Sequence, residues 1–205
     1  MPEVWNSQTL KREKLPPLSG AAQEANEISG FFKVNALTGP LASEKIVKER
    51  IENAHIIHLA THGLLEYGDP TITGKQDMPG AIALASGAGQ DGLLTASEIA
   101  TELNLQADLV VLSACDTGRG EITGDGVAGL SRALMTSGAT GVVVSLWAVP
   151  DAPTADLMVN FYKHLSSGKD NAQSLRQAML TTMETHQHPK DWAAFVLMGE
   201  AQQRE

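Results

Sequence analysis

Residues 108–118 read DLVVLSACDTG, a continuous apolar run that ends at Cys115, the single cysteine of the chain. A run without polar alternation is typical of a strand buried on both faces of a parallel sheet. A similar run, GVVVSLW at residues 141–147, comes after a segment in which apolar residues recur at helical spacing. Strands that alternate with helices predict a mainly parallel sheet with helices on both of its faces.

The same alternation is expected upstream of this run. Apolar spacing predicts a helix over residues 20–32, and Ser43 is placed to cap a second helix that leads into a strand over 54–60. The Gly-, Asp- and Pro-rich segment 64–94 predicts a hairpin beside the main sheet. Thr95 and Glu98 form a capping-box pattern, which opens a helix that ends near Leu103.

Downstream, the helix ahead of 141–147 is expected to close at Gly138. Further helices are expected from Asp151 and after the Asp170–Gln173 cap pattern, followed by a last strand at 192–198. Residues 1–19 are aperiodic and contain adjacent prolines, which predicts an extended lead-in. The remainder, 20–205, predicts one globular domain.

Charge and composition exclude several classes of protein. The net charge of −9 is concentrated after residue 50, where eight basic and eighteen acidic residues give −10. This charge repels nucleic-acid phosphates and attracts a cationic partner, or it serves only solubility. No apolar run approaches the roughly 20 residues that cross a bilayer, so no membrane association is expected. A single cysteine and an N-terminus without a secretory pattern favour the cytoplasm.

Two residues at strand ends carry the candidate chemistry. His62 follows one expected strand in HLATHG (58–63), and Cys115 follows another, so both are expected at one edge of the sheet. An imidazole beside a thiol supplies the thiolate for nucleophilic acyl transfer. The backbone N–H groups of Gly63 and Cys115 are then placed to stabilise an oxyanion. Taken singly, Cys115 also fits a small buried side chain, and His62 a loop histidine.

HLATHG and LSACDTG (112–118) resemble the two signature blocks of CHAT domains, which are relatives of caspases and separase. The resemblance extends to other segments along nearly the whole chain: LPPLSG (15–20), DGLLTA (91–96), GDG (124–126), SLW (145–147) and WAAF (192–195). It implies a caspase-like three-layer α/β sandwich and a His62–Cys115 dyad without an obligatory third acid. It also implies peptide-bond hydrolysis through a thioester, with Gly63 and Cys115 forming the oxyanion hole.

One departure from the family pattern concerns the N-terminus. CHAT domains normally have another strand before the segment that corresponds to LPPLSG, yet Met1 lies only 14 residues before Leu15. We therefore expect the chain to be the C-terminal part of a longer protein whose sheet lacks its first strand. A regulatory N-terminal module or a partner chain is then expected to cover that edge.

Three further residues are candidates for substrate binding. Asp151 lies in the loop after 145–147, where a carboxylate would bind a substrate Arg or Lys, or it caps the following helix. Asp116 either contributes to the same pocket or satisfies backbone donors of its own loop. Trp147 forms an apolar wall for the substrate or packs in the core.

No metal or cofactor is expected beside the dyad. His55 and His58 lie close to His62 in sequence, but strand geometry directs 55 and 58 to opposite faces, and no phosphate-binding loop is present. The sequence therefore predicts a cysteine endopeptidase that cleaves a protein or peptide substrate after a basic residue. The alternative is a non-catalytic CHAT-like scaffold or protein-interaction module.

Overall fold

The computed structural model describes residues 2–6, 9–67, 78–114 and 124–202. Its central sheet has the strand order β3 (Ile56–Thr61), β7 (Leu109–Ala114), β8 (Gly141–Ser145) and β9 (Phe195–Gly199). β3, β7 and β8 are parallel, and β9 is antiparallel to β8. The predicted mainly parallel sheet is confirmed.

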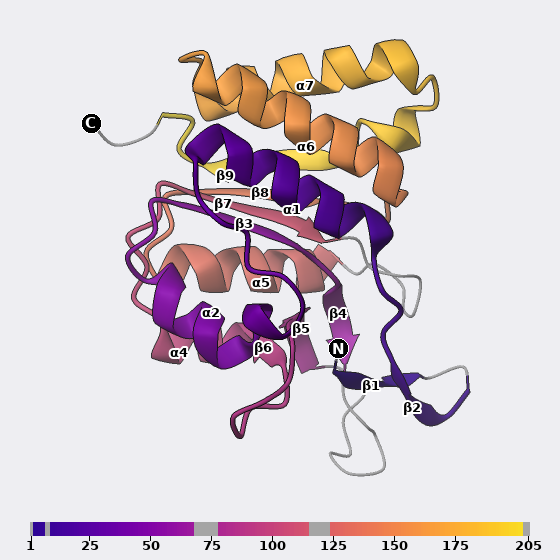
Figure 1. The fold of residues 1–205 in the computed structure, drawn as a ribbon, viewed down its shortest axis with the longest axis vertical. Coiled ribbons are helices and arrows are strands. Elements are labelled where there is room, and N and C mark those ends of the chain that lie inside the picture. Colours follow the sequence, from indigo (N-terminus) through magenta and orange to yellow (C-terminus); the bar gives the residue numbers. More distant parts are fainter. Residues whose placement is uncertain (1, 7–8, 68–77, 115–123, 203–205) are drawn as a thin grey trace.

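Helices cover both faces of this sheet, which gives three layers (Figure 1). One layer contains α1 (Ser19–Phe32), α6 (Asp151–Ser166) and α7 (Asn171–Thr185). The other contains α2 (Glu44–Ile51), α4 (Ala96–Glu102) and α5 (Gly124–Thr136). The three-layer α/β sandwich expected from the sequence is therefore present.

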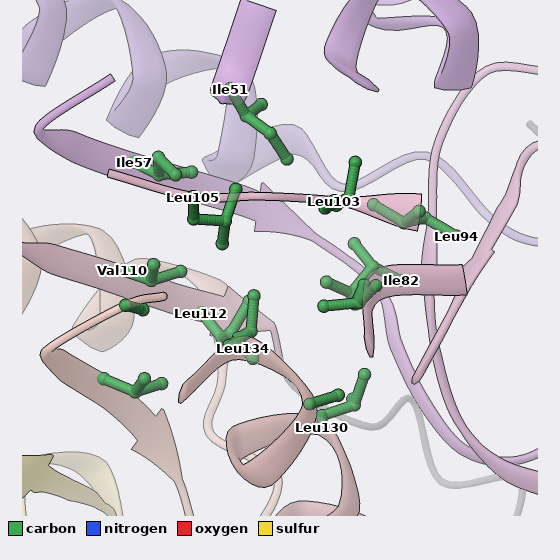
Figure 2. Packing of buried hydrophobic residues seen from close by; sticks show 14 of the residues in the cluster. Ile51, Ile57, Ile82, Leu94, Leu103, Leu105, Val110, Leu112, Leu130 and Leu134 are labelled. Carbon is green, nitrogen blue, oxygen red and sulfur yellow. The ribbon is translucent and has the colours of Figure 1, made fainter. Parts of the chain in front are cut away.

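The alternation of side chains along the strands divides the core in two. In β7, Val110 and Leu112 point to the α2–α4–α5 layer and pack in a cluster with Leu134 (Figure 2). Ile99 of α4 belongs to the same cluster. Leu109 and Val111 point to the opposite face and belong to the cluster under α1, α6 and α7. A strand buried on both sides needs apolar residues at every position, which explains the continuous run in the sequence.

A second, antiparallel sheet lies beside the first. Its strands are β4 (Gly63–Tyr67), β5 (Met78–Ala83) and β6 (Leu93–Thr95), with β5 in the middle. The β5–β6 hairpin confirms the hairpin predicted within 64–94, and β4 was not predicted. The expected lead-in contains two short strands, β1 (Glu3–Asn6) and β2 (Lys11–Lys14), which pair with each other.

Two predicted helix caps form, whereas Ser43 occupies the N-cap position of α2 without a side-chain cap hydrogen bond. The Thr95–Glu98 capping box forms, with Glu98 N–H donating to Thr95 Oγ1 at 3.1 Å and Thr95 N–H donating to Glu98 Oε2 at 2.9 Å. Asp170 caps α7 by accepting from the Gln173 N–H at 2.7 Å. Short 3-10 turns occur at Gly39–Ala42 and Pro189–Asp191.

Gly138 ends the α5 region at a position that only glycine fills easily. Its φ is +118°, and a Cβ there would lie 2.1 Å from the carbonyl oxygen of Leu105.

Two strands are shorter than expected, since β8 ends at Ser145 and β9 begins at Phe195. Within the described ranges, no helix combines the length and apolarity that a bilayer crossing requires.

Candidate active site

His62 occupies the joint between the two sheets. It lies between Thr61, the last residue of β3, and Gly63, the first residue of β4. Ala83 of β5 makes two hydrogen bonds to the joint: its N–H donates to the His62 carbonyl at 2.9 Å, and its own carbonyl accepts from the side-chain hydroxyl of Thr61 at 2.5 Å. The backbone that carries the imidazole is therefore fixed by both sheets.

The ring of His62 is fully buried, and one of its nitrogens has a defined partner. Nε2 lies 2.7 Å from the carbonyl oxygen of Pro16, and the side chain is 0% exposed. A carbonyl oxygen only accepts hydrogen bonds, so Nε2 must carry the proton. In neutral His62 the basic lone pair is then on Nδ1.

The residues around Pro16 fix the position of that carbonyl. Leu15 is 3% exposed and packs with Leu64 and Ala81 of the small sheet, and its N–H donates to the Pro2 carbonyl at 3.4 Å. Helix α1 begins at Ser19, three residues after Pro16. The segment is thus anchored at one end by the small sheet and at the other by a helix.

The strand register aligns the positions of the predicted dyad. β3 and β7 are parallel, with Thr61 opposite Ala114. His62 follows the first of these residues and Cys115 follows the second. Cys115 and Asp116 themselves lie outside the described residues, so the dyad distance and the predicted pocket role of Asp116 remain predictions.

Trp147 and Asp151 lie beyond the end of β8. Trp147 is half-buried against the α6–α7 core, and its Nε1–H donates to the Lys190 carbonyl at 3.0 Å. Asp151 is the first residue of α6, whereas Pro150 occupies the N-cap position without a side-chain cap. The alternative that Asp151 caps this helix is therefore wrong, although its charge is favourable in the first turn.

A polar network lies around His58, on the strand that ends just before His62. His58 of β3 approaches Glu24 Oε1 of α1 at 2.8 Å through Nε2, and Tyr162 Oη of α6 at 3.1 Å through Nδ1. Glu24 is 3% exposed and Tyr162 is 0% exposed. Burial, together with the negative charge of Glu24, raises the pKa of Tyr162 well above its ordinary value.

Comparison with protein families identifies the chain. The family model described as "CHAT domain" matches residues 4–200. The chain belongs to the CHAT domain family.

Among curated proteins, this CHAT domain is similar to tetratricopeptide repeat protein 28. The human and mouse proteins are each 28% identical over 211 aligned positions, which cover 89% of this chain. The matched region makes up 8% of the human protein and 9% of the mouse protein. The chain therefore corresponds to a small part of these relatives.

Among solved structures, the CHAT domain is similar to the Arg-specific cysteine proteinase gingipain R (RgpB). The TM-score is 0.62 at 12% sequence identity, and the match covers 89% of this chain and 42% of that chain. This likeness shows a shared caspase-like fold.

Three side-chain partners in this CHAT domain, Glu24, Tyr162 and Asp108, were not predicted from the sequence. Glu24 was not singled out as buried, although it lies four residues before Ile28 on the expected apolar stripe of its helix. His55 and His58 have different partners. His55 Nδ1 binds Asp108 at 3.0 Å, whereas His58 binds Glu24 and Tyr162. The sequence feature that could have indicated this network is the acidic Glu24 within the apolar stripe of its helix.

Proposed function

We propose that this CHAT domain is a cysteine endopeptidase that uses Cys115 as nucleophile and His62 as general base. The observation that carries the proposal is the hydrogen bond between His62 Nε2 and the Pro16 carbonyl. It assigns the proton to Nε2 and the basic lone pair to Nδ1. The parallel pairing of Thr61 with Ala114 supports bringing the next residue of each strand together.

The proposed reaction proceeds in two acyl transfers. The Cys115 sulfur attacks the substrate carbonyl carbon as its proton passes to His62 Nδ1, and the Gly63 and Cys115 N–H groups stabilise the oxyanion. The C–N bond then breaks, the amine leaves with the proton from His62, and a thioester remains. His62 next removes a proton from water, whose oxygen attacks the thioester and releases the acid and the thiol.

We further propose cleavage after Arg or Lys. Asp151 follows β8, the neighbour of the strand that ends beside Cys115, and a carboxylate there complements a basic side chain. The similar gingipain R is described as an Arg-specific cysteine proteinase, which supports a basic preference by analogy. Trp147, held by the Lys190 carbonyl, supplies an apolar wall for the aliphatic stem of that side chain.

The proposed substrate is a protein or peptide that the enzyme meets in the cytoplasm. The acidic charge after residue 50 attracts a cationic segment of such a substrate. A regulatory module on the N-terminal side, or a partner chain, is the proposed source of control. The curated relatives are consistent with this arrangement, since the domain accounts for less than a tenth of their length.

A second candidate function is a non-catalytic interaction module. The observation that favours it is the complete burial of the His62 ring, because a base must reach the reacting atoms. The curated relatives are named for tetratricopeptide repeats, and stacked repeats of that kind form binding surfaces. Activity that depends on Cys115 separates the two functions.

The test uses a peptide library that varies the residue before the scissile bond. The native chain, Cys115→Ala and His62→Gln are compared, with the exposed His188→Gln as the matched control. The peptidase predicts cleavage by the native chain and by His188→Gln, a loss of at least about 10³-fold in the two site variants, and an acyl-enzyme mass on Cys115. Equal cleavage by Cys115→Ala would remove the nucleophile assignment, and no cleavage by any chain would favour the interaction module.

A further inference from the structure

Few side chains of helix α1 are fully buried. Among its side chains with described exposure, only Glu24 and Ile28 are buried. Ile28 packs in the apolar cluster that contains Leu157 and Phe161 of α6. A buried carboxyl group is costly unless it is hydrogen-bonded, so the contact of Glu24 with His58 decides where the helix can lie. Phe32 of α1 adds an edge-to-face contact with Tyr162, at 5.6 Å between the ring centroids. Glu24 is the buried polar anchor of this helix.

The polar anchor is a chain of hydrogen bonds that passes through the His58 ring. The raised pKa of Tyr162 keeps its hydroxyl protonated, so this group can donate to His58 Nδ1 at 3.1 Å. The other ring nitrogen, Nε2, then carries a hydrogen and donates to Glu24 Oε1 at 2.8 Å. With neutral His58, each hydrogen atom of the chain has an acceptor. The network joins α1, β3 and α6.

The same helix determines two contacts of the candidate site. Pro16, whose carbonyl accepts from His62, lies three residues before the first residue of α1. At the first turn, Gly20 lies against Asp151, so closely that a Cβ on Gly20 would approach the Asp151 Cβ to 2.9 Å. A displacement of α1 would therefore disturb both the base and the candidate specificity residue.

We infer that Glu24, His58 and Tyr162 are positioning residues that hold α1 in the register where the Pro16 carbonyl meets His62 Nε2. The 2.7 Å separation leaves little tolerance, because a shift of about 1 Å takes the bond outside hydrogen-bonding range. A misplacement of that size costs on the order of 100-fold in rate when it affects reacting groups. The effect on catalysis rests on the proposed peptidase function, whereas the effect on the His62 ring does not.

The experiment compares Glu24→Ala with Glu24→Gln, whose amide oxygen still accepts from His58 Nε2. Glu27→Ala is the matched control, since Glu27 is exposed on the same helix. Ile99→Val, in the opposite core cluster, controls for a general loss of stability. The first readout is the NMR titration of the His62 ring, assigned by its absence in His62→Gln. The second is kcat and KM for a cleaved peptide.

We expect Glu24→Ala to shift the His62 titration midpoint by about half a unit or more and to lower kcat about tenfold. KM should change less than about twofold, and Glu24→Gln should regain most of both properties. Tyr162→Phe removes one hydrogen bond and should give a smaller change in the same direction. If Glu24→Ala does not fold, the His62 titration of Tyr162→Phe tests the inference in its place.

An unchanged His62 titration in a folded Glu24→Ala or Tyr162→Phe protein would overturn the inference. The same holds if Ile99→Val or Glu27→Ala alters His62 as strongly, because the effect would then be general loosening. If the native chain cleaves no peptide, the peptidase proposal fails on its own. The NMR titration still decides whether the network positions His62.

Discussion

His62 Nε2 and the Pro16 carbonyl oxygen are 2.7 Å apart, although 46 residues separate them in the sequence. This bond fixes which nitrogen of a fully buried imidazole is protonated. It also ties the joint between the two sheets to the segment that leads into α1. The Pro16 carbonyl thus orients the His62 ring through a hydrogen bond to its Nε2 atom.

The bond predicts that His62→Gln and His62→Leu differ in stability. A glutamine amide can still donate to the Pro16 carbonyl, whereas leucine leaves that acceptor without its donor, at a cost of about 1–3 kcal/mol. Urea denaturation should therefore show His62→Leu to be the less stable variant. Equal free energies of unfolding would contradict a stabilising role for this bond.

The contact between Gly20 and Asp151 predicts opposite effects of two alanine substitutions in α1. Gly20→Ala forces a Cβ to 2.9 Å from the Asp151 Cβ and should lower the free energy of unfolding by about 1–3 kcal/mol. Gly30→Ala meets no atom within 4 Å and should raise it by about 0.5–1 kcal/mol. Thermal denaturation checks both signs, and a neutral Gly20→Ala would mean that α1 and α6 are not in tight contact there.

The proposed pocket predicts that Asp151→Asn lowers kcat/KM for Arg and Lys substrates by roughly tenfold or more. Uncharged substrates should be much less affected, since only the counter-ion has been removed. Asp156→Asn is the matched control, because Asp156 lies on the same helix, 60% exposed and bound to His186. Retention of the basic preference by Asp151→Asn would exclude Asp151 from the pocket.

The ion pairs of Lys48 predict a dependence of stability on pH. Lys48 Nζ of α2 lies 2.8 Å from Glu98 Oε1 of α4 and 2.8 Å from Glu44 Oε1. Partial burial alone would raise the pKa of Glu98, but hydrogen bonds from Lys48 and Thr95 lower it below its ordinary value of 4.5. A lowered pKa means that the carboxylate stabilises the fold above pH 4.5 and that this contribution is lost as the pH falls below 4.5.

Glu98→Gln should therefore destabilise the protein by about 1 kcal/mol at pH 7. The difference from the native chain should shrink as the pH falls from 4.5 towards 3. Urea denaturation at a series of pH values measures this difference, and Glu27→Gln, at an exposed position of α1, provides the control. A difference that is constant from pH 7 to pH 3 would show that the charge of Glu98 contributes nothing.

The order of strands and helices could be predicted because apolar periodicity records burial directly. Residues 109–112 are apolar at every position, and the structure buries them on both faces of the sheet. The antiparallel direction of β9 could not be predicted from apolar periodicity, because it depends on the number of helices between β8 and β9. Two successive helices, α6 and α7, connect β8 to β9, so the chain returns to the end of the sheet where β8 stops.

Contacts between distant polar groups could not be predicted in the same way. The Pro16 carbonyl is a backbone group, so no residue type marks it as a partner of His62. Glu24 lies on the apolar stripe of its helix, but nothing in the sequence names its partner, and only the fold brings it to His58 across 34 residues of chain. Sequence spacing constrains neighbours within an element, whereas these partners depend on how elements pack.

The double attachment of Ala83 also makes one atom a reporter for the whole site. Its amide hydrogen is bound to the His62 carbonyl, and Ala83 is 1% exposed. Deuterium can replace that hydrogen only while the small sheet separates from the end of β3. The exchange rate of this single amide therefore measures how often the joint beneath the imidazole opens, in the free protein and with a peptide bound.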